Sequence, residues 1–289
     1  MAPRLCLGTV QLGVAYGIAG SGERVSDAQA RAILATAWEL GVRRLDTAPG
    51  YGDIEQRLTD LAAARKFEIV TKIPTLPAAI DPSASAEFVR RSLDRSLERL
   101  GEAIRGVLFH ASGDLARANG PAAWDAAQEW CAMRSVALGV SVYGPDELAV
   151  LAAERPVAMA QLPANAFDQR IASSSIVDGA IELTVRSAFL QGLLLMDEAD
   201  AARRLPAARK PLAKWHALCR ARGINPLEAA LGVVKGLRGI AYGAVGVDNA
   251  EQLSQIVAAW DAAPRLSAPE LATEDPAVID PRCWSTAQS

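Results

Sequence analysis

The sequence lacks the features that mark metal sites, disulfide scaffolds and membrane spans. Its 289 residues include four cysteines, and these stand far apart in the chain, so no CxxC pair is available for a metal or for redox chemistry. No stretch reaches the roughly 18 apolar residues that a membrane-spanning helix requires, and the N-terminus has no apolar signal core. These absences predict a cytoplasmic protein with reduced thiols and no metal site.

Charge of one sign and aromatic side chains are also scarce. The net charge is −3, no five like charges follow one another, and aromatic residues make up 5% of the chain. Binding to a nucleic acid or to a membrane surface would require a concentrated basic patch, so neither partner is expected. Hydrophobic residues, in contrast, make up 51%, which is typical of a folded globular protein.

Short apolar runs alternate with longer amphipathic segments along most of the chain. Helices are predicted at Ser26–Leu40, where Ser26 and Gln29 form a capping box, and at Ser85–Leu100. Alternating helices and short buried strands are typical of a parallel α/β sheet, and a count of eight strands favours a single-domain (β/α)8 TIM barrel. The predicted strands are Leu5–Val10, Val42–Asp46, Phe67–Lys72, Gly106–His110, Ala137–Val142, Val157–Leu162, Ile181–Phe189 and Ile240–Val245.

The C-terminal part differs in composition from the rest of the chain. From Ala262 onward it has four prolines and no periodicity. We therefore expect a barrel over residues 1–261, followed by an extended tail, residues 262–289, that packs on it. The segment Gln191–Pro211 is long for a connection between a strand and a helix, which is typical of a functional loop.

Three consecutive predicted strands end in an ionisable side chain. Asp46 ends the second, Lys72 the third and His110 the fourth, and Tyr51 follows in the loop after Asp46. The strands of a parallel barrel converge with their carboxyl ends on one face, so the four side chains are expected to meet there. Taken alone, each has an ordinary explanation as a solvated turn residue or a packed core residue, but their conjunction favours a site.

The segments that carry these residues resemble the aldo-keto reductases. The matching blocks are LDTAPGYGDIE at residues 45–55, VTK at 70–72 and VLFH at 107–110. The resemblance runs in the same order from residue 7 to the region of residue 246. It implies the barrel fold, and it implies a catalytic tetrad made of Asp46, Tyr51, Lys72 and His110.

These residue types suit the reduction of a carbonyl group. Adding a hydride to the carbonyl carbon builds negative charge on the oxygen, which must be stabilised and protonated. Tyr51 can donate that proton, and an ammonium from Lys72, held in place by Asp46, is expected to lower the phenol's pKa from about 10. His110 would orient the carbonyl through a hydrogen bond from the other side.

The resemblance also implies a binding site for NAD(P)H. Family members hold the nicotinamide with a Ser-Asn pair and a Gln, which correspond here to Ser141, Val142 and Gln161, so the asparagine is missing. Arg186 stands where the family often places an aromatic ring, and it could favour the reduced cofactor or turn toward an anionic substrate. The other positions that the resemblance assigns to the cofactor are Gly8, Thr9, Ser187, Phe189, Gln191, Gly192, Gly246 and Asp248.

The segment after the last predicted strand bears on the choice of cofactor. NADP-dependent members carry basic residues there, whereas residues 246–252 contain Asp248 and Glu251 and no Lys or Arg. A carboxylate accepts a hydrogen bond from a ribose hydroxyl and repels a phosphate. We therefore expect NAD(H) to be preferred over NADP(H), unless another basic loop reaches the phosphate.

Two functions fit these observations. The first is an NAD(P)H-dependent reductase of an aldehyde or ketone, including sugar-like or anionic ones, that acts as a monomer or homodimer. Its substrate pocket would include Gln11, Tyr16, Phe167 and Trp284. The second is a non-catalytic NAD(H)-binding regulator with a protein partner, which the departures at the cofactor site motivate. The intact tetrad favours the reductase.

Overall fold

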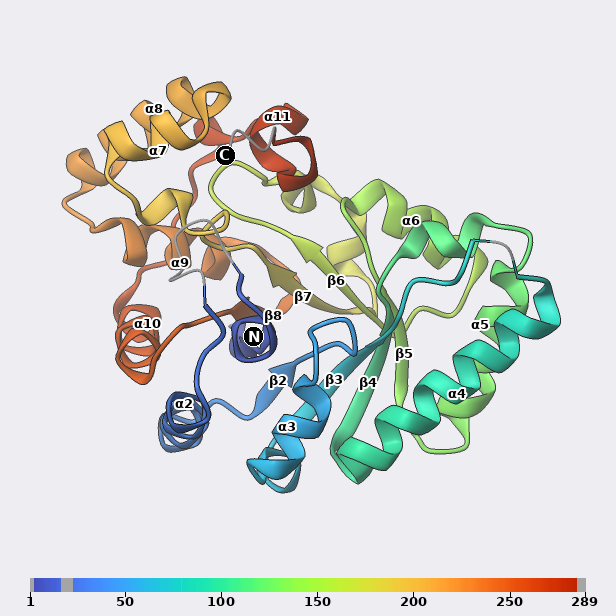
Figure 1. Ribbon diagram of the computed structural model, residues 1–289. Helices are drawn as coiled ribbons and strands as arrows, with labels where there is room; N and C mark the ends of the chain where they lie inside the picture. Colours follow the sequence, from blue (N-terminus) through green and yellow to red (C-terminus); the bar gives the residue numbers. More distant parts are fainter. Residues whose placement is uncertain (1–2, 17–22, 79, 285–289) are drawn as a thin grey trace.

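Eight parallel strands form a closed barrel in which each strand pairs with its neighbours in the sequence (Figure 1). The computed structural model describes residues 3–16, 23–78 and 80–284. This architecture confirms the predicted TIM barrel. The strands are β1 (Arg4–Gly8), β2 (Arg44–Asp46), β3 (Glu68–Ile73), β4 (Ile104–Phe109), β5 (Ala137–Ser141), β6 (Met159–Pro163), β7 (Glu182–Arg186) and β8 (Ile240–Val245).

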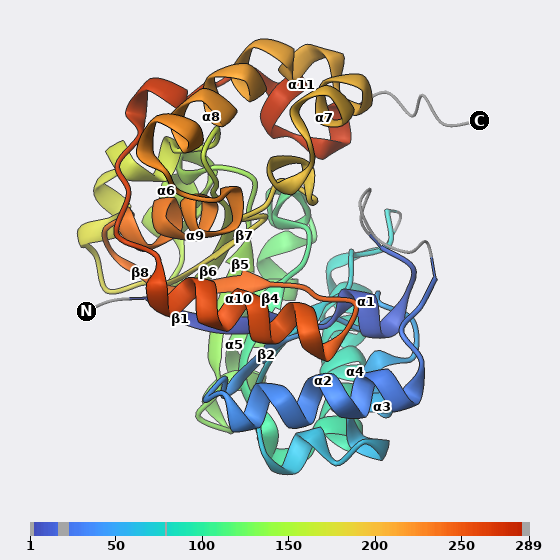
Figure 2. The same cartoon turned by 90° about the vertical axis from the view of Figure 1, so that its left-hand side faces the viewer.

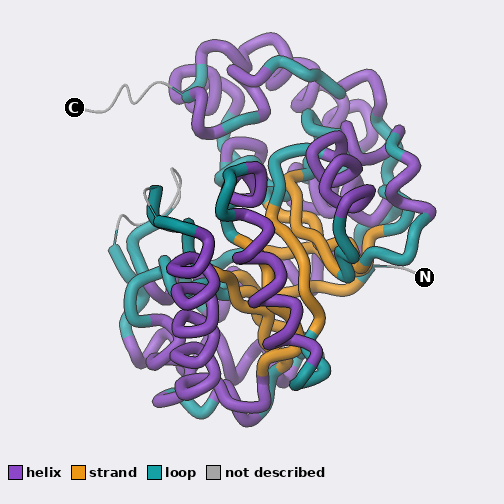
Figure 3. The backbone as a smooth tube through the Cα atoms, turned by 90° about the vertical axis from the view of Figure 1, so that its right-hand side faces the viewer, coloured by secondary structure: helices purple, strands orange, loops and turns teal. Residues whose placement is uncertain are grey.

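Helices enclose the strands on the outside, as the tube view shows (Figure 3). The connection between β6 and β7 has only short 3-10 turns, whereas the connection between β7 and β8 has three α-helices. Four-residue helices lie after β1, α1 (Val10–Gly13), and in the C-terminal segment, α11 (Pro276–Ile279). The longer helices are α2 (Asp27–Glu39), α3 (Ile54–Asp60), α4 (Pro82–Leu100), α5 (Gly120–Ala132), α6 (Pro145–Glu154), α7 (Glu198–Arg204), α8 (Arg209–Arg222), α9 (Pro226–Gly236) and α10 (Ala250–Ala262).

The boundaries of several elements differ from those predicted, for local reasons. The capping box of α2 is present, with Ser26 and Gln29 bonded to each other as predicted. Helix α4 begins three residues before the predicted start, because Asp81 caps it and Pro82 occupies its first turn, where a missing N–H costs nothing. Strand β7 ends at Arg186, before the predicted end, because Ser187 has φ 62° and leaves the β region.

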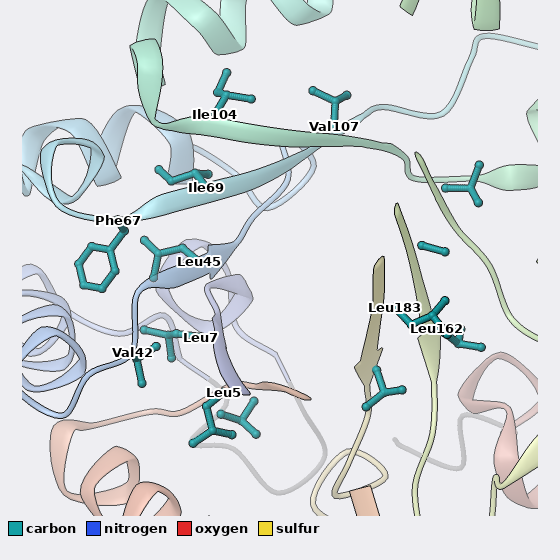
Figure 4. Close-up of a cluster of buried hydrophobic side chains, with 14 of the residues drawn as sticks. Leu5, Leu7, Val42, Leu45, Phe67, Ile69, Ile104, Val107, Leu162 and Leu183 are labelled. Atoms are coloured by element: carbon teal, nitrogen blue, oxygen red, sulfur yellow. The ribbon is translucent and has the colours of Figure 1, made fainter. Parts of the chain in front are cut away.

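Alternation along the strands places polar side chains inside the barrel. In β2, Leu45 faces the outer helices as part of the main hydrophobic core (Figure 4), so Arg44 and Asp46 face the interior on either side of it. A small apolar layer of Val70, Leu108 and Met159 fills the barrel between them. The interior is therefore layered, with Arg44 toward the amino ends of the strands and Asp46 at the carboxyl ends.

A second hydrophobic cluster lies apart from the main core, under α7, α8, α9 and the C-terminal segment. Figure 2 shows α7, α8 and α11 grouped together and away from α2 and α3. Leu271 and Val278 pack into this cluster, and the Thr273 N–H donates to the Phe167 carbonyl at 2.9 Å. This segment contains 3-10 turns as well as α11, so it is not uniformly extended. The domain boundary at residue 261 stays a prediction.

All four cysteines are free thiols. Burial raises the pKa of Cys131 to about 12 and that of Cys219 to about 11, and it raises the pKa of the buried Cys6 as well. Cys283 is exposed. Among the described residues, three or more potential metal ligands never gather at one point. Within the same part of the chain, every helix is too short or too polar to cross a bilayer.

Candidate active site

The four side chains that the sequence singles out lie together at the carboxyl ends of the strands. Lys72 Nζ donates to Asp46 Oδ1 at 2.7 Å and to the Thr47 carbonyl at 2.9 Å. The same Nζ lies 5.3 Å from the centre of the Tyr51 ring. The Tyr51 and His110 rings meet edge to face, with their centres 5.9 Å apart. The expected meeting of acid, amine, phenol and imidazole is therefore observed.

The loop that carries Tyr51 is held closely against the segment after β1. A Cβ atom on Gly13 would lie 1.9 Å from the Tyr51 carbonyl oxygen, so only glycine fits at that position. On the other side of Tyr51, Gly52 has φ 74°, which glycine adopts without strain. Two glycines thus allow the approach that places the phenol above β2 and β3.

The amine and the carboxylate form a buried ion pair. The Lys72 side chain is 1% exposed and the Asp46 side chain 10%. Burial alone would lower the pKa of Lys72, but the Asp46 carboxylate outweighs it and the net pKa is raised. The amine therefore carries its positive charge throughout the neutral pH range. Gln161 Nε2 also donates to Asp46 Oδ1, at 2.9 Å.

The protonation of Tyr51 differs from the expectation that its pKa is lowered. Burial raises the pKa of the phenol above its ordinary value of 10, and the opposing effect of the Lys72 charge is smaller. The Lys72 charge lowers the pKa of the phenol, as expected, but by less than burial raises it. Tyr51 therefore carries its proton at neutral pH, as a proton donor must. For His110, burial lowers the pKa to about 4 and the Lys72 charge contributes, so the imidazole is neutral.

A pocket of about 420 Å³ opens over this cluster. Most of the residues that the resemblance assigns to cofactor or substrate line it: Gly8, Gln11, Tyr16, Gln161, Arg186, Ser187, Phe189, Gln191, Gly192, Gly246 and Asp248, together with Asp46 and Tyr51. Ser141 and Thr9 are buried beside it and do not line it. The Thr9 hydroxyl instead donates to the Asp46 carbonyl at 3.0 Å, which joins β1 to β2.

Two residues expected to contact substrate lie elsewhere. Phe167 is fully buried in the second hydrophobic cluster, and Trp284 packs against that same cluster. Neither side chain lines the pocket. Both rings pack in the second hydrophobic cluster, and their contact with substrate stays a prediction.

The segment after β7 has a backbone feature that the sequence did not signal. Ser187, Leu190 and Gln191 have φ values of 62°, 48° and 55°, and Gly192 follows with 93°. Left-handed backbone at non-glycine residues costs energy, and in folded proteins it gathers at functional sites. Three of these four residues line the pocket, the exception being Leu190. The strained segment therefore forms one wall of the pocket.

Gln11 offers an unpaired polar atom to the same pocket. Its Oε1 is buried and has no hydrogen-bond partner. A Cβ atom on Gly246 would lie 2.4 Å from that oxygen, so the glycine keeps this part of the wall open. A buried acceptor without a donor is costly, and a ligand with N–H or O–H groups would satisfy it. This wall therefore fits a polar cofactor such as a nicotinamide dinucleotide.

Comparisons with known proteins agree with this geometry. The model of the aldo/keto reductase family matches residues 4–277, and the chain belongs to that family. The family uses nicotinamide cofactors and small carbonyl substrates. No curated protein matches the sequence significantly.

Solved structures of similar fold come from several bacteria. A protein of Pseudomonas aeruginosa assigned to the aldo-keto reductases is 25% identical, with a TM-score of 0.66 and 91% of each chain covered. The holo form of the aldo-keto reductase AKR11C1 from Bacillus halodurans is 20% identical, with a TM-score of 0.69 and coverage of 93% of this chain and 90% of that one. The glycerol dehydrogenase AKR11B4 from Gluconobacter oxydans is 20% identical, with a TM-score of 0.66 and coverage of 89% and 86%. The two proteins at 20% identity support the fold alone.

Proposed function

We propose that this protein reduces a small aldehyde or ketone to an alcohol, with NADH as the preferred reductant and Tyr51 as the proton donor. The observation that carries the proposal is the meeting of Tyr51, Lys72, Asp46 and His110, two of which, Tyr51 and Asp46, line the pocket. A protonated phenol beside a buried ammonium and a neutral imidazole is a suitable arrangement for protonating an oxyanion.

Each residue of the tetrad has a distinct task in this reaction. A reduced nicotinamide, when bound, would supply hydride for the carbonyl carbon. As the carbonyl electron pair moves onto oxygen, Tyr51 Oη gives its proton to that oxygen and becomes a phenolate. The Lys72 ammonium stabilises the phenolate, and Asp46 holds the ammonium in place. His110 donates an N–H to the carbonyl oxygen and fixes its position, and the phenolate then recovers a proton from water.

Three parts of the pocket would hold the cofactor. The strained segment after β7 and the unpaired Gln11 oxygen provide polar contacts, and Asp248 stands at another point of the wall. Arg186 is the sole Lys or Arg among the described residues that line the pocket. A 2′-phosphate placed beside Asp248 would meet a carboxylate, and the described lining offers no basic side chain besides Arg186, which supports the preference for NADH.

The decisive experiment has two arms. Fluorescence titration with NADH and NADPH measures both affinities, and tenfold tighter binding of NADPH would overturn the cofactor preference. A panel of aldehydes and ketones is then followed through the loss of NADH absorbance. Oxidation of NADH with some member of the panel supports the reductase. Tight NADH binding without any turnover would instead favour the non-catalytic regulator.

A further inference from the structure

A second pocket adjoins the first, and one arginine belongs to both. This second pocket of about 320 Å³ is bounded by the loop after β5, the end of β6 and the C-terminal segment. Tyr143, Arg170 and Arg282 are among its lining residues. Arg186 lines this pocket and the pocket above the tetrad, so its guanidinium stands at their boundary.

The three arginines of the second pocket differ in how they are paired. Arg170 grips both oxygens of Asp168 through Nε and Nη2, each at 2.8 Å. Arg282 contacts both oxygens of Asp280 at 2.6 to 3.1 Å. Across the described residues, Arg186 has no carboxylate partner, and its contacts to Ser187 Oγ and the Val142 carbonyl are long, at 3.4 and 3.5 Å. Its five N–H donors are therefore largely unused.

The unpaired guanidinium is nevertheless held in place. Its central carbon lies 4.9 Å from the centre of the Tyr143 ring, and the Arg282 guanidinium lies on the same ring at 3.4 Å. Stacking on an aromatic ring fixes a guanidinium plane and leaves its edge free to donate. Arg186 is thus a half-buried, oriented cation with free donors.

The Arg186 guanidinium lies in the same pocket as the groups expected to react. Arg186 lines the pocket above the tetrad together with Tyr51 and Asp46, and its charge adds to burial and the Lys72 charge in lowering the pKa of His110. The second pocket is also lined by acids: Asp146, Glu147, Glu274 and Asp280. Asp280 senses the Arg186 charge, but both of its oxygens are already bound by Arg282. An anion at the boundary therefore meets the unpaired Arg186 guanidinium.

We propose that Arg186 determines substrate specificity by binding the carboxylate of an aldehyde or ketone whose carbonyl is held by Tyr51 and His110. The inference rests on the proposed reductase function and names its substrate class, a carbonyl compound with a carboxylate close to the reacting carbon. A planar carboxylate matches the guanidinium edge with two parallel hydrogen bonds, which are stronger than neutral ones. The polar second pocket then accommodates further hydroxyl groups of the substrate.

The test compares matched pairs of substrates. Glyoxylate is measured against methyl glyoxylate, and succinic semialdehyde against its methyl ester, in wild type and in Arg186→Gln. We expect wild type to prefer the carboxylate in at least one pair, and Arg186→Gln to reduce that ratio of kcat/KM by about 10- to 100-fold, mainly through KM. Arg186→Lys keeps the positive charge but loses the two parallel N–H donors, so it should give an intermediate ratio. It replaces Arg186→Gln in the comparison if that variant does not fold. An unchanged ratio overturns the inference.

A control and a binding measurement separate this inference from the proposed function. The double variant Asp178→Asn with Arg238→Gln removes an exposed neutral ion pair whose residues line neither pocket, and the ratio should change less than about threefold. Calorimetry then measures the affinity of succinate, which cannot be reduced, in the presence of NAD. If no aldehyde is reduced but succinate binds and Arg186→Gln weakens it, the reductase proposal fails and the anion site stands. If aldehydes are reduced but succinate binding does not depend on Arg186, the anion site fails alone.

Discussion

Gln161 donates a hydrogen bond from Nε2 to Oδ1 of Asp46, at 2.9 Å, and the same oxygen accepts from Lys72 at 2.7 Å. The side chain that the resemblance assigns to the nicotinamide thus also fixes the carboxylate of the tetrad. Gln161→Met removes this donor, so the buried Asp46 carboxylate loses one of its hydrogen bonds. We expect weaker NADH binding, a lower kcat and a loss of about 1–2 kcal/mol in the free energy of unfolding. Titration, kinetics and urea denaturation measure the three, and loss of NADH affinity alone would contradict the coupling.

Replacement of Tyr51 by Phe removes the proton donor and preserves the ring. We expect kcat to fall by about 10²- to 10⁴-fold, the usual contribution of a general acid, while NADH still binds. Stopped-flow and steady-state assays measure the rate, and fluorescence measures the affinity. Tyr242→Phe is the matched control, because that phenol lies at the amino ends of the strands beside Arg4 and Arg44. Retained turnover in Tyr51→Phe would remove Tyr51 from the mechanism.

The Asp46–Lys72 pair should show strong thermodynamic coupling. Removing either partner leaves an uncompensated buried charge, so Asp46→Asn and Lys72→Met should each cost about 3–5 kcal/mol of unfolding free energy. The double variant leaves no charge behind and should cost clearly less than the sum. Chemical denaturation of the four proteins gives the coupling energy. Additive costs would mean that water or other groups screen the pair.

The depressed pKa of His110 makes stability depend on pH. In the unfolded chain the imidazole titrates near 6.5, and in the folded protein near 4. Below 6.5 the unfolded state therefore binds a proton that the folded state refuses, and stability falls as pH decreases. Between pH 7 and pH 5 this residue should account for a loss of about 2 kcal/mol. Denaturation at both pH values in wild type and His110→Gln tests this, since the variant should lack that part of the loss.

Arg57 lies in α3 and binds the segment that precedes α2. Its 5% exposed side chain donates to the Leu12 carbonyl, to the Val25 carbonyl at 2.7 Å and to Asp27 at 2.8 Å. Arg57→Gln should cost about 3 kcal/mol of unfolding free energy, because buried carbonyl groups lose a charged donor.

The matched control for Arg57 is Arg24→Gln, which breaks an exposed ion pair with Asp53. Its cost should stay below about 1 kcal/mol. Thermal and chemical denaturation measure both variants. Equal costs would show that the Arg57 contacts contribute little.

The barrel and the meeting of Asp46, Lys72 and His110 at one rim were predictable because they follow from local periodicity, whereas the role of Tyr51 rested on the resemblance. Alternation along β2, with Leu45 facing outward, puts Asp46 inside, and parallel strands bring Lys72 and His110 to the same rim. Whether burial or the Lys72 charge decides the pKa of Tyr51 was not predictable from periodicity. The net pKa of Tyr51 depends on how much water its surroundings exclude, which only the packed structure decides.

The C-terminal segment was expected to pack on the barrel, but the residues that it contacts there were beyond the sequence. Its folding back over the barrel determines that Phe167 and Trp284 fill a hydrophobic cluster. The same packing creates the second pocket and places Arg282 on the ring that holds Arg186. These contacts join residues far apart in the chain, and no local pattern announces them.

The unequal accessibility of the thiols has a practical consequence. Cys6, Cys131 and Cys219 are buried, so a maleimide dye added to the native protein should attach at Cys283 alone. That residue directly follows Arg282, which lines the second pocket. A fluorophore installed there without mutagenesis would report optically on small molecules entering beside Arg186.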